Sequence, residues 1–248
     1  GQLPRERQHY GRTVTAVDLE ARRLVFEDGE TVDYDALISS MPLDCLLGLI
    51  RGRDDLAARA GEFVHSSSHI VGVGLDGAPP EDLTTKCWMY FPESSSPFYR
   101  VTVFSNYSPN NVGRPGEQWS LMAEVSESPE KPVDHERVAN DVVEAFRRIG
   151  FMRPDEQPVS VWYRRMERGY PTPWLGRDEV LGPVQAELER YDVFSRGRFG
   201  TWKYEVSNQD HSVMQGVEAV GRILQGTEEF TFSGRMEDWL EPTFGPGG

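Results

Sequence analysis

The stretch SRGRFGTWKYEVSNQDHSVMQGVEAV, residues 195–220, holds the most informative pattern of this 248-residue chain. Two arginines alternate with glycines, three aromatic residues follow, and a polar cluster at 207–212 opens onto an amphipathic helix. Glycine permits close backbone approach, arginine binds phosphate through paired hydrogen bonds, and a helix N-terminus presents free N–H groups. The stretch therefore suits a large, planar, anionic ligand such as a flavin dinucleotide. On these residues alone, an ordinary capped helix fits the helix start equally well.

The helix in this stretch has two natural N-cap residues before it, Asn208 and Asp210. A flavin ring edge at its start would have its negative charge stabilised by the helix dipole, which raises the electron density at the reactive N5 atom. Apolar side chains then recur at helical spacing and predict packing against a core. They are Val213, Met214, Val217, Val220, Ile223 and Leu224.

The formal net charge is −14, which argues against a nucleic-acid-binding surface because such a surface needs a basic face. Local arginines can still bind a nucleotide sugar. No apolar run is long enough to span a bilayer. Cys45 and Cys87 form no disulfide framework, so we expect buried thiols and a reducing cytoplasm.

Strand and helix patterns alternate along the rest of the chain. Three alternating runs separated by turns predict an N-terminal β-meander at 12–20, 22–28 and 30–41. The runs KCWMYFP, YRVTVFSNYS and QWSLMAEVSES predict strands of one antiparallel sheet, with further strands at 69–77 and 158–166. Helices are predicted at 44–50, 54–63, 134–149 and 183–190, the last with proline in its first turn.

No G-x-G-x-x-G opening follows a strand in this sequence. The glycines of VGVGLDG lie inside a strand pattern and precede Ala-Pro-Pro rather than a helix. If a dinucleotide binds, its phosphate loop comes from elsewhere.

Aromatic residues and one arginine gather at 86–109, KCWMYFPESSSPFYRVTVFSNYSP. On strands, Trp88 and Tyr90 share a face, as do Arg100 and Thr102. An aromatic cleft with an arginine suits a nucleoside diphosphate. Aromatic cross-strand pairs beside an exposed arginine are the simpler interpretation, and composition alone favours it.

Other polar groups carry weaker signals. Tyr170, in the loop-like run YRRMERGYPTP, could bind phosphate or fill the core. His65 and His69 lie four apart but lack a further ligand, so we expect no metal site. A solvated surface is the better interpretation for the acidic residues Glu124, Glu127 and Glu130.

The stretch at 195–219 closely resembles the C-terminal flavin-binding segment of UDP-galactopyranose mutases of the eukaryotic type, found in fungi and protozoa. LISSMPLD, KCWMYFPESSSPFYRVTVFSNYSP, WSLMAEVSESPEKPV and RRMERGYPTP resemble further blocks of that family, in the same order. The resemblance runs from about residue 14 to residue 226. It lacks the family's N-terminal part with the glycine-rich loop, so the chain resembles the C-terminal half of such an enzyme.

The resemblance implies interconversion of UDP-galactopyranose and UDP-galactofuranose through a flavin N5–sugar adduct, without net redox change. It implies FAD in the reduced form, with NADPH or NADH as reductant, and a UDP-sugar as substrate. The N-terminal half of the enzyme, or another polypeptide, would complete the FAD site. The sequence leaves self-association into a homo-oligomer open, and a bacterial style of composition leaves open a sugar other than galactose.

The resemblance also assigns expected roles to residues. Arg100 matches a pyrophosphate-binding arginine and Asn208 a substrate-contacting asparagine beside the flavin, and we expect both to be catalytic. Matched positions in the family predict further substrate contacts for Trp88, Tyr90, Tyr107, Tyr170 and Tyr204. Flavin contacts are predicted in the same way for Val14, Arg198, Gln209 and Ser212.

The expected fold is mixed α/β. It comprises part of a glutathione-reductase-like FAD-binding domain, with the β-meander at 1–50 and the last strand and helix at 195–230. An antiparallel substrate-binding sheet with helices occupies 51–194, and a flexible tail occupies 231–248. Two alternatives remain: a flavin oxidoreductase like the amine or protoporphyrinogen oxidases, and a nucleotide-sugar-binding fragment without catalysis.

Overall fold

The computed structural model describes residues 3–233 and divides into two compact units. The first comprises residues 3–64 and 171–233, and the second comprises residues 65–170. Residues 51–64 and 171–194, expected with the substrate sheet, lie in the first unit. Most of the expected tail, from residue 234 onward, lies outside the described residues.

The first unit contains the expected β-meander, in shortened form. Strands β1 (Val14–Asp18), β2 (Arg23–Phe26) and β3 (Thr31–Asp33) pair antiparallel, and β5 (Ile50–Arg51) pairs parallel to β1. The run at 30–41 does not form one strand, because bends at Asp35 and Ala36 interrupt it. Its second half, β4 (Leu37–Ser39), instead pairs parallel with β11 (Val193–Ser195).

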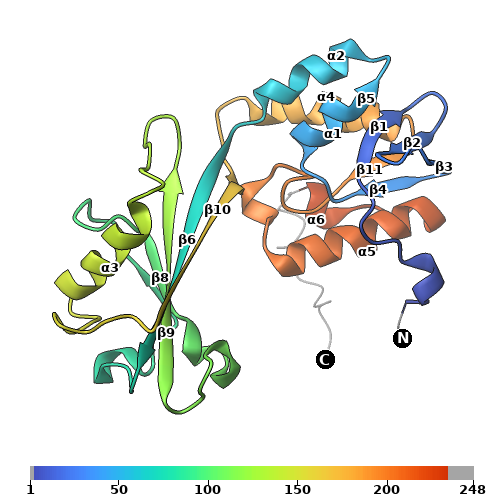
Figure 1. The fold of residues 1–248 in the computed structure, drawn as a ribbon. Coiled ribbons are helices and arrows are strands. Elements are labelled where there is room, and N and C mark those ends of the chain that lie inside the picture. The colour runs from blue at the N-terminus through green and yellow to red at the C-terminus, as the bar shows by residue number, and fades with distance from the viewer. Residues whose placement is uncertain (1–2, 234–248) are drawn as a thin grey trace, which may run out of the picture. The chain divides into compact units, whose positions relative to one another are not determined.

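Five helices accompany these strands in the described part of the first unit (Figure 1). They are α1 (Leu43–Leu49), α2 (Asp54–Ala57), α4 (Arg177–Glu189), α5 (Gln209–Gln225) and α6 (Phe230–Ser233). Helix α4 begins after Gly176, whose φ of 82° suits glycine, and Pro183 lies inside the helix rather than in its first turn. Pro183 has no N–H to donate to the carbonyl of Glu179, and the acidic residues Asp178 and Glu179 lie in the first turn of the helix.

The core of the first unit is built largely of leucines from α1 and α4, together with Trp202. Trp202 is 1% exposed, and its ring packs edge-on against Phe63 and Phe199. Its indole N–H donates to the carbonyl of Val64 at 2.9 Å, so the one polar atom of this buried ring is satisfied.

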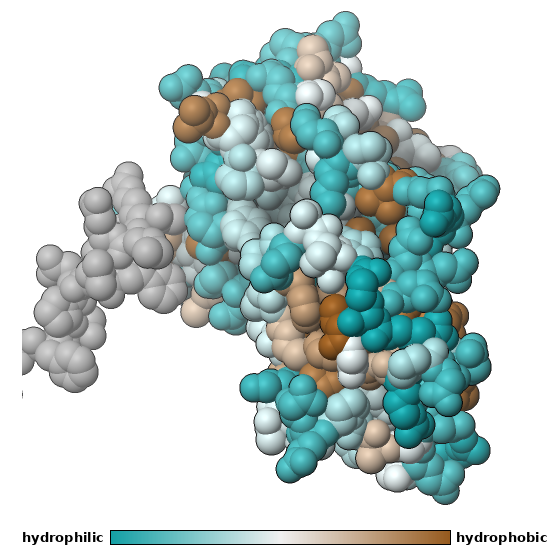
Figure 2. All heavy atoms as spheres, turned by 90° about the vertical axis from the view of Figure 1, so that its left-hand side faces the viewer, coloured by the Kyte–Doolittle hydropathy of each residue, from teal (hydrophilic) through white to brown (hydrophobic). Residues whose placement is uncertain are grey.

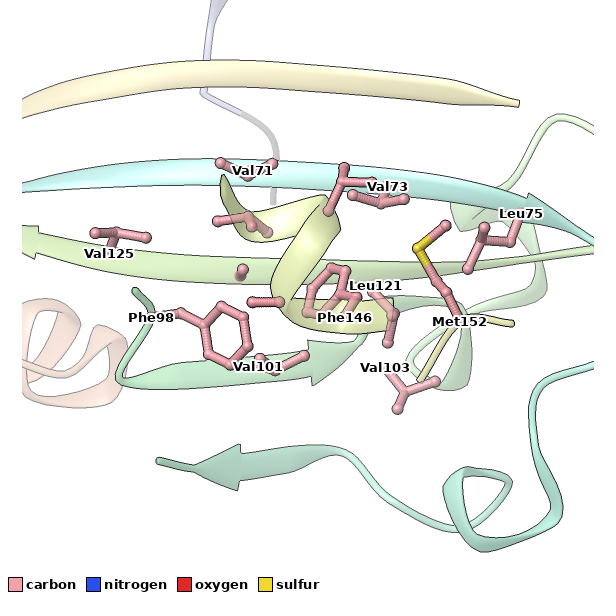
Figure 3. Close-up of a cluster of buried hydrophobic side chains, with 14 of the residues drawn as sticks. Val71, Val73, Leu75, Phe98, Val101, Val103, Leu121, Val125, Phe146 and Met152 are labelled. Atoms are coloured by element: carbon pink, nitrogen blue, oxygen red, sulfur yellow. The ribbon is translucent and has the colours of Figure 1, made fainter. Parts of the chain in front are cut away.

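The second unit is a five-stranded sheet of order β10-β6-β9-β8-β7, with α3 (Val138–Arg148) against one face (Figure 1). Strand β6 pairs antiparallel with β9, β9 with β8, and β8 with β7. Valines and leucines alternate along the strands toward α3 and meet Phe146 of that helix (Figure 3). The strands are β6 (His65–Asp76), β7 (Trp88–Tyr90), β8 (Arg100–Val103), β9 (Gln118–Glu127) and β10 (Ser160–Pro171).

Short 3₁₀ segments connect these elements. They are Arg5–Arg7, Ala58–Glu62, Glu81–Leu83, Phe104–Asn106, Pro109–Asn111 and Tyr204–Val206. Cys45 is half-buried and Cys87 is exposed, so the expectation of buried thiols is wrong. None of the helices within residues 3–233 has the length and apolar character that a membrane crossing requires. Figure 2 shows hydrophilic residues over most of the face it displays, with hydrophobic residues in smaller patches, in keeping with the net charge of −14.

Candidate functional site

Three predicted substrate residues lie on the face of the second unit's sheet that points away from α3. Arg100 on β8 stands opposite Tyr90 on β7 and opposite Glu124 on β9. Directly opposed residues share a face, and Trp88 lies two residues before Tyr90, on the same face. Val101, next in β8, points instead into the core. The strand register therefore brings Trp88, Tyr90 and Arg100 together.

Arg100 is held by a carboxylate and a tyrosine. Its Nε and Nη2 atoms donate to the two oxygens of Glu124, each at 2.7 Å, and Nη2 also donates to the Tyr170 hydroxyl at 3.0 Å. Burial opposes the charge on Arg100, but hydrogen bonds to Glu124 and Tyr90 outweigh it and raise its pKa. The bonds to Glu124 and Tyr170 use three of the five N–H donors and fix the guanidinium plane.

Glu124 holds the guanidinium of Arg100, a contact that the sequence did not predict. It was expected on a solvated acidic surface, yet it is 6% exposed. Besides Arg100, it accepts a hydrogen bond from the Tyr99 hydroxyl at 2.8 Å. The signal that could have found it is the alternation along β9, which places residue 124 on the face opposite to buried Ala123 and Val125.

Aromatic side chains surround the outer part of Arg100. Its guanidinium carbon lies 5.4 Å from the Trp88 ring centroid, within the range of a cation–π contact. Tyr107 packs edge-on against Trp88 at 6.5 Å. Trp88, Tyr90 and Tyr107 are 57%, 64% and 47% exposed, so their rings are accessible to a ligand. They do not form the closed aromatic packing that composition alone favoured.

Tyr170 does not lie in a loop, contrary to expectation. It belongs to β10, which continues to Pro171. At Gly169 a side chain is excluded, because a Cβ would lie 2.2 Å from the Ser68 hydroxyl and 2.9 Å from the Ser68 backbone nitrogen. This close approach of β10 to β6 places the Tyr170 hydroxyl against Arg100.

A cavity of about 670 Å³ opens in the second unit beside β6 and β9. Its lining includes Gly72 and Met122, which stand opposite each other in the row next to Arg100. Trp162 of β10 closes one side. The face that carries Arg100 thus continues into a largely apolar hollow.

The first unit carries the second group of predicted residues. Arg196 and Arg198, the two arginines that alternate with glycine before α5, have different surroundings. Arg196 is 2% exposed and pairs with Glu229 at 2.6 Å and Glu189 at 2.7 Å. Arg222 contacts the same two carboxylates. Arg196 therefore belongs to a buried ion cluster and is not available to a phosphate.

The loop between β11 and α5 is fixed by two buried glutamines. Gln215 accepts from the amide of Gly197 at 2.7 Å and donates to the carbonyl of Val206 at 3.0 Å. Gln185 donates to the carbonyl of Gly200 at 2.8 Å. A Cβ on Gly200 would lie 2.2 Å from the Arg196 carbonyl oxygen, so this turn requires glycine.

The start of α5 gathers the predicted flavin contacts. Asn208 is the N-cap, and its side chain forms no capping hydrogen bond. The Ser212 amide and hydroxyl both bond to the Asn208 carbonyl, at 2.9 and 3.0 Å. Arg198 donates through Nε to the carbonyl of Ser207 at 2.9 Å, which holds its guanidinium beside the helix start. Gln209 is the first helical residue.

This arrangement fits a flavin ring edge. The amides of the first turn, at Gln209, Asp210 and His211, have no acceptor one turn earlier in the helix, and a 17-residue helix adds its dipole. The structure adds His211, which sequence reasoning missed: within residues 3–233 its buried Nδ1 atom has no hydrogen-bond partner. A buried ring nitrogen with unmet hydrogen bonding is a signal for a ligand beside it.

The two remaining predicted residues also lie in the first unit. Tyr204 begins the 3₁₀ segment before α5 and is 53% exposed. Its neighbour Glu205 pairs with Arg177 of α4 at 2.6 Å, which ties the segment to the core. Val14 opens β1 opposite Phe26 and packs against the first unit's core. The predicted site residues are thus divided between the two units.

The apolar stripe of α5 is exposed, which overturns the expectation of core packing. Gln215 and Ala219 are the buried residues of this helix. The periodicity correctly indicated an apolar face, but that face points away from the first unit's core. Its exposed members are Val213, Met214, Val217, Val220 and Leu224, at 69%, 46%, 60%, 45% and 74%.

Comparison with solved structures gives a strong match to a reduced UDP-galactopyranose mutase. The two share 46% identity and superpose with a TM-score of 0.89, and the match covers 94% of this chain and 51% of that one. The chain therefore spans about half the length of the mutase, as expected for a resemblance to its C-terminal half. No family model matches the chain.

Two more distant structures show the fold alone. A putative protoporphyrinogen oxidase from Exiguobacterium sp. 255-15 is 16% identical, with a TM-score of 0.52, over 75% of this chain and 39% of its own. A CLA-producing fatty acid isomerase from P. acnes is 14% identical, with a TM-score of 0.58, over 86% of this chain and 47% of its own. The mixed α/β architecture is thus shared with the mutase and with more distant proteins.

Proposed function

We propose that this chain forms the substrate-binding part and half of the flavin site of a UDP-sugar mutase, which interconverts UDP-galactopyranose and UDP-galactofuranose. The 46% identity to a UDP-galactopyranose mutase over nearly the whole chain supports this proposal. The observation that carries it furthest is the fixed guanidinium of Arg100, anchored by Glu124 and Tyr170 and flanked by Trp88.

In this proposal Arg100 binds the diphosphate of the UDP-sugar. Because Glu124 fixes the guanidinium plane, little side-chain freedom is lost on binding. Tyr107, Tyr170 and Tyr204 donate to phosphate oxygens, and Trp88 and Tyr90 contact flat faces of the substrate. Charge that develops on the departing diphosphate is stabilised by donors already in place.

The start of α5 holds the flavin in this proposal. Bound FAD, reduced by NADPH or NADH, would supply a nucleophilic ring nitrogen. The amides of Gln209 and its neighbours, with the helix dipole, stabilise negative charge at the pyrimidine edge of the ring. Arg198 and Ser212 orient that edge, Val14 contacts the adenosine part through its backbone, and Asn208 contacts the sugar.

The exposed stripe on α5 supports a further part of the proposal. A contiguous apolar helix face in water marks an interaction surface. We propose that the N-terminal half of the mutase, which the match does not cover, packs on this stripe. It could belong to the same protein or be a separate polypeptide. That half would also supply the phosphate loop for FAD.

The test uses the 248-residue chain alone and the chain co-expressed with the N-terminal half of a UDP-galactopyranose mutase. With FAD and dithionite, we expect the co-expressed pair to convert UDP-galactofuranose into UDP-galactopyranose, measured by chromatography. Oxygen uptake with an amine or porphyrin, and no conversion, would identify an oxidase instead. A colourless chain that binds UDP but stays inactive in both forms would indicate a binding fragment.

A further inference from the structure

A second cluster of chemically active side chains lies in the second unit, away from Arg100. His69 on β6 stands opposite Val125, a core residue on β9, so it points to the face that α3 covers. Glu127 lies two residues further along β9, on the same face. His135 precedes α3. These three residues come from different segments and meet at one end of the sheet.

The geometry of the cluster is that of a set of metal ligands. One ligand atom from each of His69, Glu127 and His135 can be chosen so that all lie within 4.8 Å of one another. The two imidazole rings are 5.0 Å apart. Two histidine nitrogens and a carboxylate oxygen form a common ligand set for zinc, with bonds of about 2.0–2.2 Å.

His69 is completely buried, so its ring nitrogens need partners within the protein or a bound ion. Its Nδ1 atom lies 2.8 Å from the Tyr163 hydroxyl, and its Nε2 atom lies 3.2 Å from a Glu127 oxygen without forming a hydrogen bond. If Nδ1 carries the proton and Tyr163 accepts it, the lone pair of Nε2 faces the carboxylate. A cation between two such acceptors would relieve their repulsion.

The surroundings of the cluster match those of known metal centres. The second nitrogen of a metal-binding histidine usually has a fixed partner, here Tyr163, and the carboxylate is itself held in place. Arg165 supplies that hold, through a bond from Nε to Oε2 of Glu127 at 2.6 Å. Arg165 also pairs with Glu167. With neutral histidines the group of Glu127, Arg165 and Glu167 has a net charge of −1, which attracts a cation.

His135 gives access from solvent. Its side chain is 51% exposed, and its Nε2 lies 2.7 Å from Oε1 of Glu127. An exposed ligand can turn aside to admit an ion, and three protein ligands leave a fourth position for water.

We propose that His69, Glu127 and His135 bind a zinc ion, with water as the fourth ligand. The ion joins β6, β9 and the segment that leads into α3. Because the cluster lies on the sheet face opposite to Arg100, this site is separate from the proposed UDP-sugar site. Its test therefore does not depend on mutase activity.

The experiment titrates Zn²⁺ into the chelator-treated 248-residue chain by calorimetry, with excess Mg²⁺ present to occupy sites made of carboxylates alone. We expect one Zn²⁺ per chain. His135→Ala should weaken binding by at least about 100-fold, and Tyr163→Phe by about 10–100-fold through the loss of the partner of Nδ1. His9→Ala, which removes another exposed histidine, is the matched control and should bind like the wild type.

Cobalt gives a second measurement, since Co²⁺ in a tetrahedral site with nitrogen ligands absorbs visible light strongly. The absorption should appear in the wild type and in His9→Ala and be lost in His135→Ala. Far-ultraviolet circular dichroism checks that each variant is folded. An absence of stoichiometric Zn²⁺ binding in the wild type, or equal affinity in His135→Ala and His9→Ala, would overturn the proposal and assign a proton to the space between His69 and Glu127.

Discussion

Both oxygens of the Glu124 carboxylate accept hydrogen bonds from Arg100, at 2.7 Å from Nε and 2.7 Å from Nη2. The Glu124 side chain is 8% exposed and that of Arg100 is 18% exposed. Water therefore cannot readily replace either partner. The same contact serves the fold, by neutralising a buried carboxylate, and the proposed site, by fixing the guanidinium.

Removal of Arg100 should affect stability and binding separately. Arg100→Ala leaves Glu124 buried and unpaired, which should cost about 3 kcal/mol, the lower end of the range for a broken buried pair, because Arg100 is partly exposed. The double variant Arg100→Met with Glu124→Gln should recover most of that loss. Urea unfolding measures both. If the double variant is as unstable as the single one, the unpaired carboxylate is not the cause.

UDP binding should not recover in that double variant. Since neither of the two replacement side chains supplies a positive charge, affinity measured by calorimetry should stay at least about tenfold below that of the wild type. Arg153→Ala removes an exposed arginine of the same unit and should leave UDP binding unchanged. Unchanged affinity in the double variant would remove Arg100 from the diphosphate site.

The buried cluster around Arg196 should control the stability of the first unit. Glu229→Ala removes a carboxylate that contacts both Arg196 and Arg222, leaves a 2% exposed arginine undercompensated, and should cost about 3–5 kcal/mol. Glu228→Ala, at an exposed neighbouring position, should change the free energy of unfolding by less than about 0.5 kcal/mol. Equal effects in guanidinium unfolding would contradict a role for the cluster.

Two glycine substitutions should have opposite signs. Gly200→Ala forces a Cβ into the Arg196 carbonyl, which is backbone and cannot move aside alone, so it should destabilise the fold by more than about 2 kcal/mol. Gly216→Ala lies in helix α5 with nothing within 4 Å of the added Cβ, and should stabilise by about 0.5–1 kcal/mol. Thermal unfolding distinguishes the two, and a neutral Gly200→Ala would contradict the geometry of the turn.

The exposed stripe of α5 should matter only when the N-terminal half of a mutase is present. Val217→Glu places a charge where the side chain is already 60% exposed, so the stability of the isolated chain should change by no more than about 0.5 kcal/mol. Co-purification with the N-terminal half of a mutase should be lost. Leu175→Glu, at a 100% exposed position of the same unit, is the control and should leave co-purification intact. Intact co-purification of Val217→Glu would remove α5 from that contact.

Acid should weaken the second unit through Glu127. Burial opposes the charge on Glu127, but hydrogen bonds with His135 and Arg165 outweigh it and lower its pKa from 4.5 to about 2. A lowered folded-state pKa means that this stabilisation is present above about pH 4.5 and is lost as the pH falls toward 2. In metal-free buffer, the loss of unfolding free energy between pH 5 and pH 3 should be smaller in Glu127→Gln than in the wild type. An equal loss would assign the acid sensitivity to other carboxylates.

Much of the fold could be predicted from periodicity and turn residues. Helix α3 and the strands β6 to β9 lie within or close to their predicted ranges, because each buries one regular face against a core formed by its own unit. The errors have local causes. Pro183 was interpreted as marking a helix start, but it lies inside α4. The run at 30–41 was predicted as one strand, but its second half, β4, pairs with β11, which lies more than 150 residues later in the chain.

The candidate site was less predictable, because the type of a residue does not reveal which side chain it pairs with in the folded protein. Arg196 and Arg198 look equivalent in the sequence, yet only the packing of Glu189 and Glu229 shows that Arg196 is already neutralised. The α5 stripe shows the complementary limit: an apolar period identifies a face to be covered, but not the segment that covers it. The fixed position of Arg100 likewise depends on the register of β8 with β9, which no local pattern encodes.

The ion cluster around Arg196 also restricts which amino-acid substitutions this protein can accept during evolution. Its charges come from α4, α5, the residue after β11 and the residue before α6, so no single helix or strand controls the balance. A lineage that loses Glu229 would have to pass through a variant with an unpaired internal cation unless Arg196 or Arg222 changed as well. We expect relatives to retain or replace these four charges together, as one inherited set.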